Sequence, residues 1–181
     1  DLPEGETEHY GELEHAIDLI ELMRSGFDGA DAIERIAVAA FPNGHPESTS
    51  IDHDIEVLRA KQEAGATLAI TQLFFFAEDY LRFVERAIAK GITIPILPGL
   101  MPITSPARLA RVIELTGEKL PVDLEHRLQS TEDPRERAQH GVAWCADMIR
   151  DLVDAKAPGV HLYAFNQHET VLSALEQAGV R

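Results

Sequence analysis

Cysteine is almost absent from the sequence, where Cys145 is the single thiol among 181 residues. One thiol excludes a framework of intramolecular disulfides and suits a reducing compartment. Long apolar runs are also missing, since none approaches the ~18 uninterrupted apolar residues that a membrane-spanning helix requires. The first residues lack the basic segment and apolar stretch that are typical of a signal peptide. We therefore expect a cytoplasmic protein that does not insert into a membrane.

Basic residues are scarce relative to acidic ones, with 16 lysines and arginines against 31 aspartates and glutamates and a formal net charge of −15. A partner with a phosphate backbone would require clustered lysine and arginine side chains. The charge balance therefore argues against nucleic acid as a partner. The length favours one domain, spanning 1–181, that is large enough to bury a core.

Apolar residues recur at three- and four-residue steps in several segments, which is the spacing of amphipathic helices. Other apolar runs are short and end at turn-forming residues, as buried strands do. Ser105 before Pro106, and Asp133 before Pro134, are typical helix starts. Helices are predicted at 8–23, 54–64, 79–90, 105–115, 121–128, 133–155 and 169–178, and strands at 35–41, 67–75, 92–97 and 161–166.

One helix followed by four strand–helix units indicates an α/β fold, with a parallel sheet covered by helices. An open dinucleotide-binding sheet would normally carry the turn GxGxxG after a strand, and the sequence has none. Polar and turn-forming residues gather instead where strands are predicted to end, at 42–47, 71–72, 98–102 and 163–166. Such a rim is typical of the active face of a (β/α)8 barrel, and the predicted strands account for about half of one.

Three polar residues stand out because of their surroundings. Gln72 lies in an apolar strand. Its amide either forms hydrogen bonds with the neighbouring backbone or binds a heterocycle that presents both donors and acceptors. His45 directly follows a strand and is either an exposed loop residue or a donor to a cofactor. Lys61, together with Arg59, lies on a helix of an acidic chain and is either solvated or part of a pyrophosphate site.

The cluster Asp52-His53-Asp54 raises a metal site as a hypothesis. Metal ligands converge from different elements, however, and adjacent residues rarely do so. Asp54 is better explained as a helix cap or first-turn acid, and no metal is expected. Cys145 is interpreted as a small buried apolar residue rather than a nucleophile.

Four segments follow one another in a specific order: 38–47 (VAAFPNGHPE), 58–75 (LRAKQEAGATLAITQLFF), 96–103 (ILPGLMPI) and 158–167 (PGVHLYAFNQ). Their succession resembles the methylenetetrahydrofolate reductase family over essentially the whole chain. The resemblance implies a TIM (β/α)8 barrel of which this chain covers roughly the second half, from the fourth helix through the fifth to eighth strands with their helices. The opening residues Asp1-Leu2-Pro3 resemble the end of the loop after the fourth strand.

The resemblance also implies the chemistry. Members of the family bind FAD without a covalent bond. NADH or NADPH reduces this flavin, which then reduces 5,10-methylenetetrahydrofolate to 5-methyltetrahydrofolate and so feeds methionine synthesis. Contacts to FAD are implied for Asp1, Tyr10, His45, Asp54 and Lys61.

Substrate contacts are implied for Gln72, which would bind the pterin and the nicotinamide, and for Arg108 and Gln167. Gln167 stands where the family often has an arginine, and Phe76 stands where an aspartate is common. The general acid of the family is a glutamate near the end of the first strand. No residue of this chain is therefore expected to fill that catalytic role, and the isolated chain is expected to be inactive.

Two other interpretations stay open. The chain could be a non-catalytic half-barrel module, because exposed sheet edges favour pairing with a second copy or with the missing N-terminal half. It could also belong to another flavin-dependent barrel oxidoreductase, such as a relative of proline dehydrogenase. The sequence does not distinguish NADH from NADPH.

Overall fold

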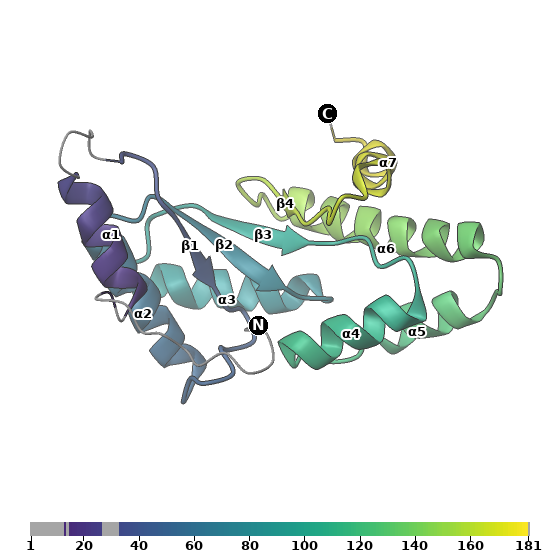
Figure 1. The fold of residues 1–181 in the computed structure, drawn as a ribbon, viewed down its shortest axis with the longest axis horizontal. Coiled ribbons are helices and arrows are strands. Elements are labelled where there is room, and N and C mark those ends of the chain that lie inside the picture. The colour runs from purple at the N-terminus through teal and green to yellow at the C-terminus, as the bar shows by residue number, and fades with distance from the viewer. Residues whose placement is uncertain (1–12, 14, 27–32, 181) are drawn as a thin grey trace, which may run out of the picture.

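The computed structural model describes residue 13, residues 15–26 and residues 33–180 (Figure 1). Its strands are β1 (Ala37–Ala40), β2 (Leu68–Leu73), β3 (Ile96–Leu100) and β4 (His161–Leu162). Its helices are α1 (Ala16–Ser25), α2 (Ile51–Ala64), α3 (Ala77–Ala89), α4 (Pro106–Thr116), α5 (Val122–Gln129), α6 (Pro134–Asp154) and α7 (His168–Ala178). This is the predicted order of elements.

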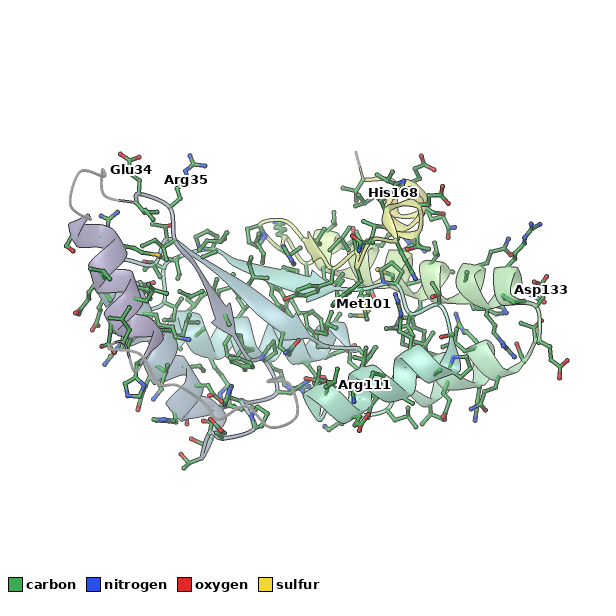
Figure 2. The ribbon with its side chains drawn as sticks, viewed as in Figure 1. Glu34, Arg35, Met101, Arg111, Asp133 and His168 are labelled. Atoms are coloured by element: carbon green, nitrogen blue, oxygen red, sulfur yellow. The ribbon has the colours of Figure 1, made fainter. Side chains whose placement is uncertain are left out.

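The strands form one sheet in the order β1-β2-β3-β4, and each neighbouring pair is parallel. This confirms the predicted α/β class. Consecutive strands are connected through helices, so the carboxyl ends of all strands and the loops that follow them lie at one rim of the sheet. Figure 2 shows Glu34 and Arg35 before β1, at the edge opposite Met101, which follows β3.

The two faces of the sheet differ in what covers them. Ala69 of β2 packs in the main core with α2, α3 and α6, and Leu73 packs against α4 and α5. Because side chains alternate along a strand, Ile70 and Gln72 point to the other face, where they are only partly buried. Ala39 of β1 is exposed. Within the described residues, helices therefore cover one face (Figure 1), and we call the other, which carries Ala39, Ile70 and Gln72, the open face.

The main core lies between the sheet and helices α2, α3 and α6. Fully buried side chains of these helices include Ile55, Phe83 and Ile149. Helix α6 approaches the segment after β3 so closely that a Cβ on Gly141 would overlap the carbonyl group of Ile103. Glycine is therefore required at this position, and its close contact holds α6 against the loop that leaves the carboxyl end of β3.

The helices begin near the predicted capping residues. Ser105 caps α4 by accepting a hydrogen bond from the backbone N–H of Arg108 at 3.2 Å, and Asp133 caps α6. Helix α2 begins earlier than predicted because Ser50 caps it, which places Asp54 in its first turn. The first predicted helix corresponds to α1, although residues 8–12 and 14 of the prediction lie outside the described residues. No helix in the described part of the chain is long and apolar enough to cross a membrane.

The third strand begins later than predicted and continues through Pro98 and Gly99, which the sequence suggested as its end. The reason is the side chain of Gln62 on α2. Its Oε1 accepts hydrogen bonds from the backbone N–H groups of Thr93 at 2.7 Å and Ile94 at 3.0 Å. Because these donors bond to a helix, they do not enter the sheet ladder, and strand pairing starts after them.

The fourth strand is shorter than the predicted segment 161–166 and ends at Leu162. The backbone of Phe165 and Asn166 has φ values of 43° and 63°, which are left-handed and incompatible with a strand. The backbone N–H of Gln167 donates to the carbonyl of Ala164 at 2.7 Å. A turn over 164–167 therefore replaces the second half of the predicted strand.

Candidate functional site

A cleft of 610 Å³ lies beside the carboxyl end of β1. It is lined by residues of β1, of the loop that follows β1, of α2, and of the beginning of α1. His45, Asp54 and Lys61 all line this cleft. The structure thus brings together every described residue for which the family resemblance implies a cofactor contact.

The loop between β1 and α2 is held by its own polar groups. The backbone N–H of His45 donates to Asp54 Oδ2 at 3.2 Å, and the backbone N–H of Glu47 donates to His45 Nδ1 at 3.2 Å. The imidazole also packs edge-on against the ring of Phe41, with 4.7 Å between centroids. Because Nδ1 accepts a hydrogen bond, the neutral imidazole carries its proton on Nε2. His45 therefore offers a ligand one fixed N–H donor.

Lys61 supplies the cleft with a cation. Its Nζ lies 3.5 Å from the carbonyl oxygen of Ala39, so the side chain reaches from the last turn of α2 to the end of β1. Burial lowers the pKa of Lys61, while the nearby Asp54 carboxylate acts in the opposite direction. A partly desolvated ammonium group in a cleft is suited to bind an anionic ligand.

A smaller cavity of 320 Å³ lies on the other side of the same loop and shares His45 and Asp54 with the cleft. Here Asn43 Nδ2 donates to Glu118 Oε2 at 2.7 Å and to Asp79 Oδ2 at 3.1 Å. Burial raises the pKa of Glu118; the hydrogen bond from Asn43 opposes this, and the charge of Asp79 adds to it. Sequence reasoning missed this cluster because its members are far apart in the chain and carry no common motif.

Gln72 lies near the carboxyl end of β2 on the open face. Its Oε1 accepts a hydrogen bond from the backbone N–H of Leu73 at 2.8 Å, which is the local bond that the sequence left as one alternative. This bond occupies one lone pair of Oε1 and fixes the amide, so that the two N–H donors of Nε2 and the second lone pair are suited to a ligand. The structure does not place Gln72 among the residues that line the 610 Å³ cleft.

Arg108 and Gln167 are brought together, although they are far apart in sequence. Arg108 Nη1 donates to Gln167 Oε1 at 3.0 Å, and both side chains are partly buried. Arg108 lies in the first turn of α4 and Gln167 at the start of α7, so the pair lies at the carboxyl rim. The contact orients the guanidinium while leaving its other donors for an anion.

Other residues singled out in the sequence have structural roles or lie outside the described part. Asp52 pairs with Arg86 of α3 at 2.9 Å, and this hydrogen bond and charge lower the pKa of Asp52. Cys145 is buried in the main core, as predicted, and burial raises its pKa to about 12. Asp1 and Tyr10 lie outside the described residues.

Comparison with known proteins decides the family. A sequence model described as "Methylenetetrahydrofolate reductase" matches residues 1–179. The chain belongs to the methylenetetrahydrofolate reductase family. This membership implies a TIM barrel, and the parallel sheet with its helices agrees with that fold.

Two relatives that are named as methylenetetrahydrofolate reductases are similar to this chain along most of its length. "5,10-methylenetetrahydrofolate reductase" of Escherichia coli (strain K12) is 33% identical over 170 residues, which is 92% of this chain and 55% of that protein. "Probable methylenetetrahydrofolate reductase (NADPH)" of Caenorhabditis elegans is 34% identical over 182 residues, which is 99% of this chain and 27% of that protein. The chain thus spans about half of the bacterial relative and about a quarter of the nematode one.

A solved structure also resembles the chain. It is described as "Uncharacterized protein from Clostridium thermocellum binds two copies of 5-methyl-5,6,7,8-tetrahydrofolic acid". The TM-score is 0.51 with 17% sequence identity, and the match covers 78% of this chain and 51% of that chain. At this identity the likeness concerns the fold.

Proposed function

We propose that the chain is the C-terminal half of the barrel of a methylenetetrahydrofolate reductase and supplies much of its flavin and folate site. The whole enzyme would reduce 5,10-methylenetetrahydrofolate to 5-methyltetrahydrofolate with NADH or NADPH. The observation that carries this proposal is the convergence of His45, Asp54 and Lys61 on one cleft at the carboxyl rim.

The residues of the cleft fit FAD in charge and in hydrogen-bonding capacity. Bound FAD would carry the hydride between the nicotinamide and the folate. Lys61 places a partly buried cation where the diphosphate of a dinucleotide can bind, and His45 Nε2 supplies an N–H donor. Asp54 orders the loop that carries His45. Asp1 and Tyr10 are proposed FAD contacts on the sequence resemblance alone.

The folate side of the site is proposed to lie along the same rim, from β2 to the start of α7. Gln72 offers Nε2 to the edge of a pterin or nicotinamide ring. Arg108, oriented by Gln167, offers a cation to a substrate carboxylate. The tetrahydrofolate ligands named for the Clostridium thermocellum structure, which shares the fold, are in keeping with a folate site here.

The open face supports the assignment to half of a barrel. In a closed barrel this face is packed with side chains from all strands, and the sheet has no free edge. We propose that the remaining strands, together with the glutamate that protonates the folate, are supplied by an N-terminal half. The chain alone is then expected to bind ligands without turnover, and the whole enzyme to be cytoplasmic.

The affinity for FAD tests this proposal. We define the joined protein as this chain placed after the part of the Escherichia coli relative that it does not span. The joined protein is expected to show flavin absorbance bands and folate-dependent oxidation of NADH or NADPH. Lys61→Met should weaken FAD binding roughly 10- to 150-fold, because hydrogen bonds to charged groups are worth roughly 1.5–3 kcal/mol. Quenching of flavin fluorescence measures the dissociation constant.

Arg59→Met is the matched control. Arg59 is also a basic residue of α2, but it is exposed and pairs with Glu63 at 3.5 Å. FAD affinity should therefore be the same in Arg59→Met and in the parent. If the joined protein binds no flavin, or if both variants bind FAD like the parent, the proposed function is wrong. If a proline analogue protects the joined protein and a folate analogue does not, the assignment to a relative of proline dehydrogenase is favoured.

A further inference from the structure

The loop between β1 and α2, residues 41–50, lies between two open spaces. The 610 Å³ cleft borders one side and the 320 Å³ cavity borders the other, and His45 and Asp54 line both. Of the residues in this loop, only Pro42 is buried. A segment with so little packing depends on its hydrogen bonds for local order.

Asn43 connects this loop to elements beyond α2. Within the described residues, it is the only residue of the loop that forms hydrogen bonds to an element other than α2. Both N–H groups of its amide are used, one by Asp79 on α3 and one by Glu118 after α4. Asn43 lies two residues before His45, so it ties down the part of the loop that carries the imidazole.

Glu118 is placed by the way in which α4 ends. Gly117 has a φ of 70°, and its N–H donates to the carbonyl of Ile113 at 2.9 Å, which ends the helix. The hydroxyl of Thr116 donates to the carbonyl of Val112 at 2.8 Å and accepts the N–H of Glu118 at 3.3 Å. Helix α4 runs back toward the loop after β1 (Figure 1), and its end thus presents the Glu118 carboxylate to Asn43.

We propose that Glu118 is a positioning residue for the cofactor site: through Asn43 it holds the loop in the conformation that presents His45 to the cleft. This inference rests on the proposed function. Glu118 acts at a distance, because it lines the cavity and not the cleft. The apparent affinity of a ligand is reduced by the fraction of molecules in the binding-competent state. Loosening the loop should therefore weaken FAD binding although no contact to FAD is removed.

The sign of the effect separates positioning from simple charge. A carboxylate repels an anionic cofactor, so loss of its charge alone would tighten FAD binding. Positioning predicts the opposite: Glu118→Ala should weaken FAD binding by the joined protein about two- to tenfold, the factor that one net hydrogen bond contributes. Glu118→Gln loses the charge but keeps an oxygen acceptor for Asn43, so it should bind FAD at least as tightly as the parent. Quenching of flavin fluorescence gives the dissociation constants.

Amide hydrogen exchange of the full chain, followed by NMR without FAD, tests the loop directly. The N–H groups of His45 and Ser48 donate to Asp54 Oδ2 and to the carbonyl of His45, respectively. Both should exchange about two- to tenfold faster in Glu118→Ala than in the parent. The same is expected for Asn43→Ala. Because Glu118 acts through Asn43, the double variant should exchange no faster than Asn43→Ala alone.

Glu114→Ala is the matched control. Glu114 is an exposed acid of α4 that pairs with Arg111 at 2.8 Å, so its loss should change neither FAD affinity nor exchange. The proposal is overturned if Glu118→Ala binds FAD as tightly as the parent, if Glu118→Gln binds it as weakly as Glu118→Ala, or if loop exchange is unchanged. It is also overturned if Glu118→Ala adds to the effect of Asn43→Ala. A parent joined protein that binds no flavin overturns the proposed function as well, whereas flavin binding that Glu118→Ala leaves unchanged overturns this inference alone.

Discussion

Gly141 shows at the residue scale how a close backbone contact reverses an ordinary preference. Glycine in a helix interior normally costs about 1 kcal/mol relative to alanine. At Gly141, however, an added methyl group would overlap the carbonyl of Ile103. Gly141→Ala should therefore lower the free energy of unfolding by roughly 1–3 kcal/mol, as overpacking does. Urea denaturation followed by circular dichroism measures this change.

The control for this prediction is Gln139→Ala, an exposed position on the same helix. Its free energy of unfolding should stay within about 0.5 kcal/mol of the parent. If Gly141→Ala is as stable as the parent, α6 can move away from the loop after β3, and the glycine is not required there.

Single residues also show what sequence reasoning can reach. The burial of Cys145 is predictable, because it lies in an apolar stretch of a long helix. The partner of Gln72 is not, because an amide in a strand has several backbone groups within reach and only the folded geometry selects the N–H of Leu73. The left-handed backbone of Phe165 is likewise not evident from the sequence, where the residue lies in a predicted apolar strand.

At the scale of elements, Asn43 ties three segments together: the loop after β1, the first turn of α3 and the segment after α4. Asn43→Asp would place a third carboxylate beside Asp79 and Glu118. It would also remove the hydrogen bond that opposes the raised pKa of Glu118. We expect the variant to lose roughly 1 kcal/mol of stability at pH 7, since one part-buried and one exposed hydrogen bond are replaced by charge repulsion.

The pH dependence of this loss has a defined sign. A carboxyl group whose pKa is higher in the folded than in the unfolded state favours folding fully at pH below the unfolded value, and this stability is lost as pH rises through the folded value. For Glu118 the ordinary value is 4.5. The difference between Asn43→Asp and the parent should thus shrink as pH falls from the raised folded value of Glu118 toward about 4.5, in urea titrations at several pH values. Asn166→Asp, at an exposed turn, should show no such dependence; an equal loss there would contradict the explanation.

Elements were predictable where local chemistry defines them and less so where tertiary contacts do. The caps Ser105 and Asp133 act within one helical turn, and the helices begin beside them as expected. The start of β3 depends on Gln62, which lies about thirty residues earlier on α2 and removes backbone donors from the ladder. The cluster around Asn43 is equally non-local, with partners 36 and 75 residues away.

At the scale of the whole molecule, the open face is the feature that governs association. Ala39 is exposed on it, and β1 presents a strand edge in the described sheet. The isolated chain should therefore self-associate in light scattering as its concentration rises, and the joined protein should not do so through this face. This is also the specific expectation of the binding-module alternative.

Ala39→Lys tests whether the open face is responsible. A charge on this face should reduce self-association of the isolated chain, because burying an unpaired ammonium group is costly. Ala107→Lys, an exposed position on α4, should leave association unchanged. If the isolated chain scatters as one copy at every concentration, the open face does not drive pairing.

The carboxylate of Asp54 interacts with two neighbours. It accepts a hydrogen bond from the backbone N–H of His45, and its negative charge stabilises the ammonium group of Lys61. An anion that binds Lys61 weakens the attraction between Lys61 and Asp54. This changes the strength of the hydrogen bond by which Asp54 orders the loop. By thermodynamic reciprocity, a change in how well the loop is ordered must alter the affinity for the anion by the same factor. Anion binding in the cleft and local folding of the segment after β1 are therefore thermodynamically coupled.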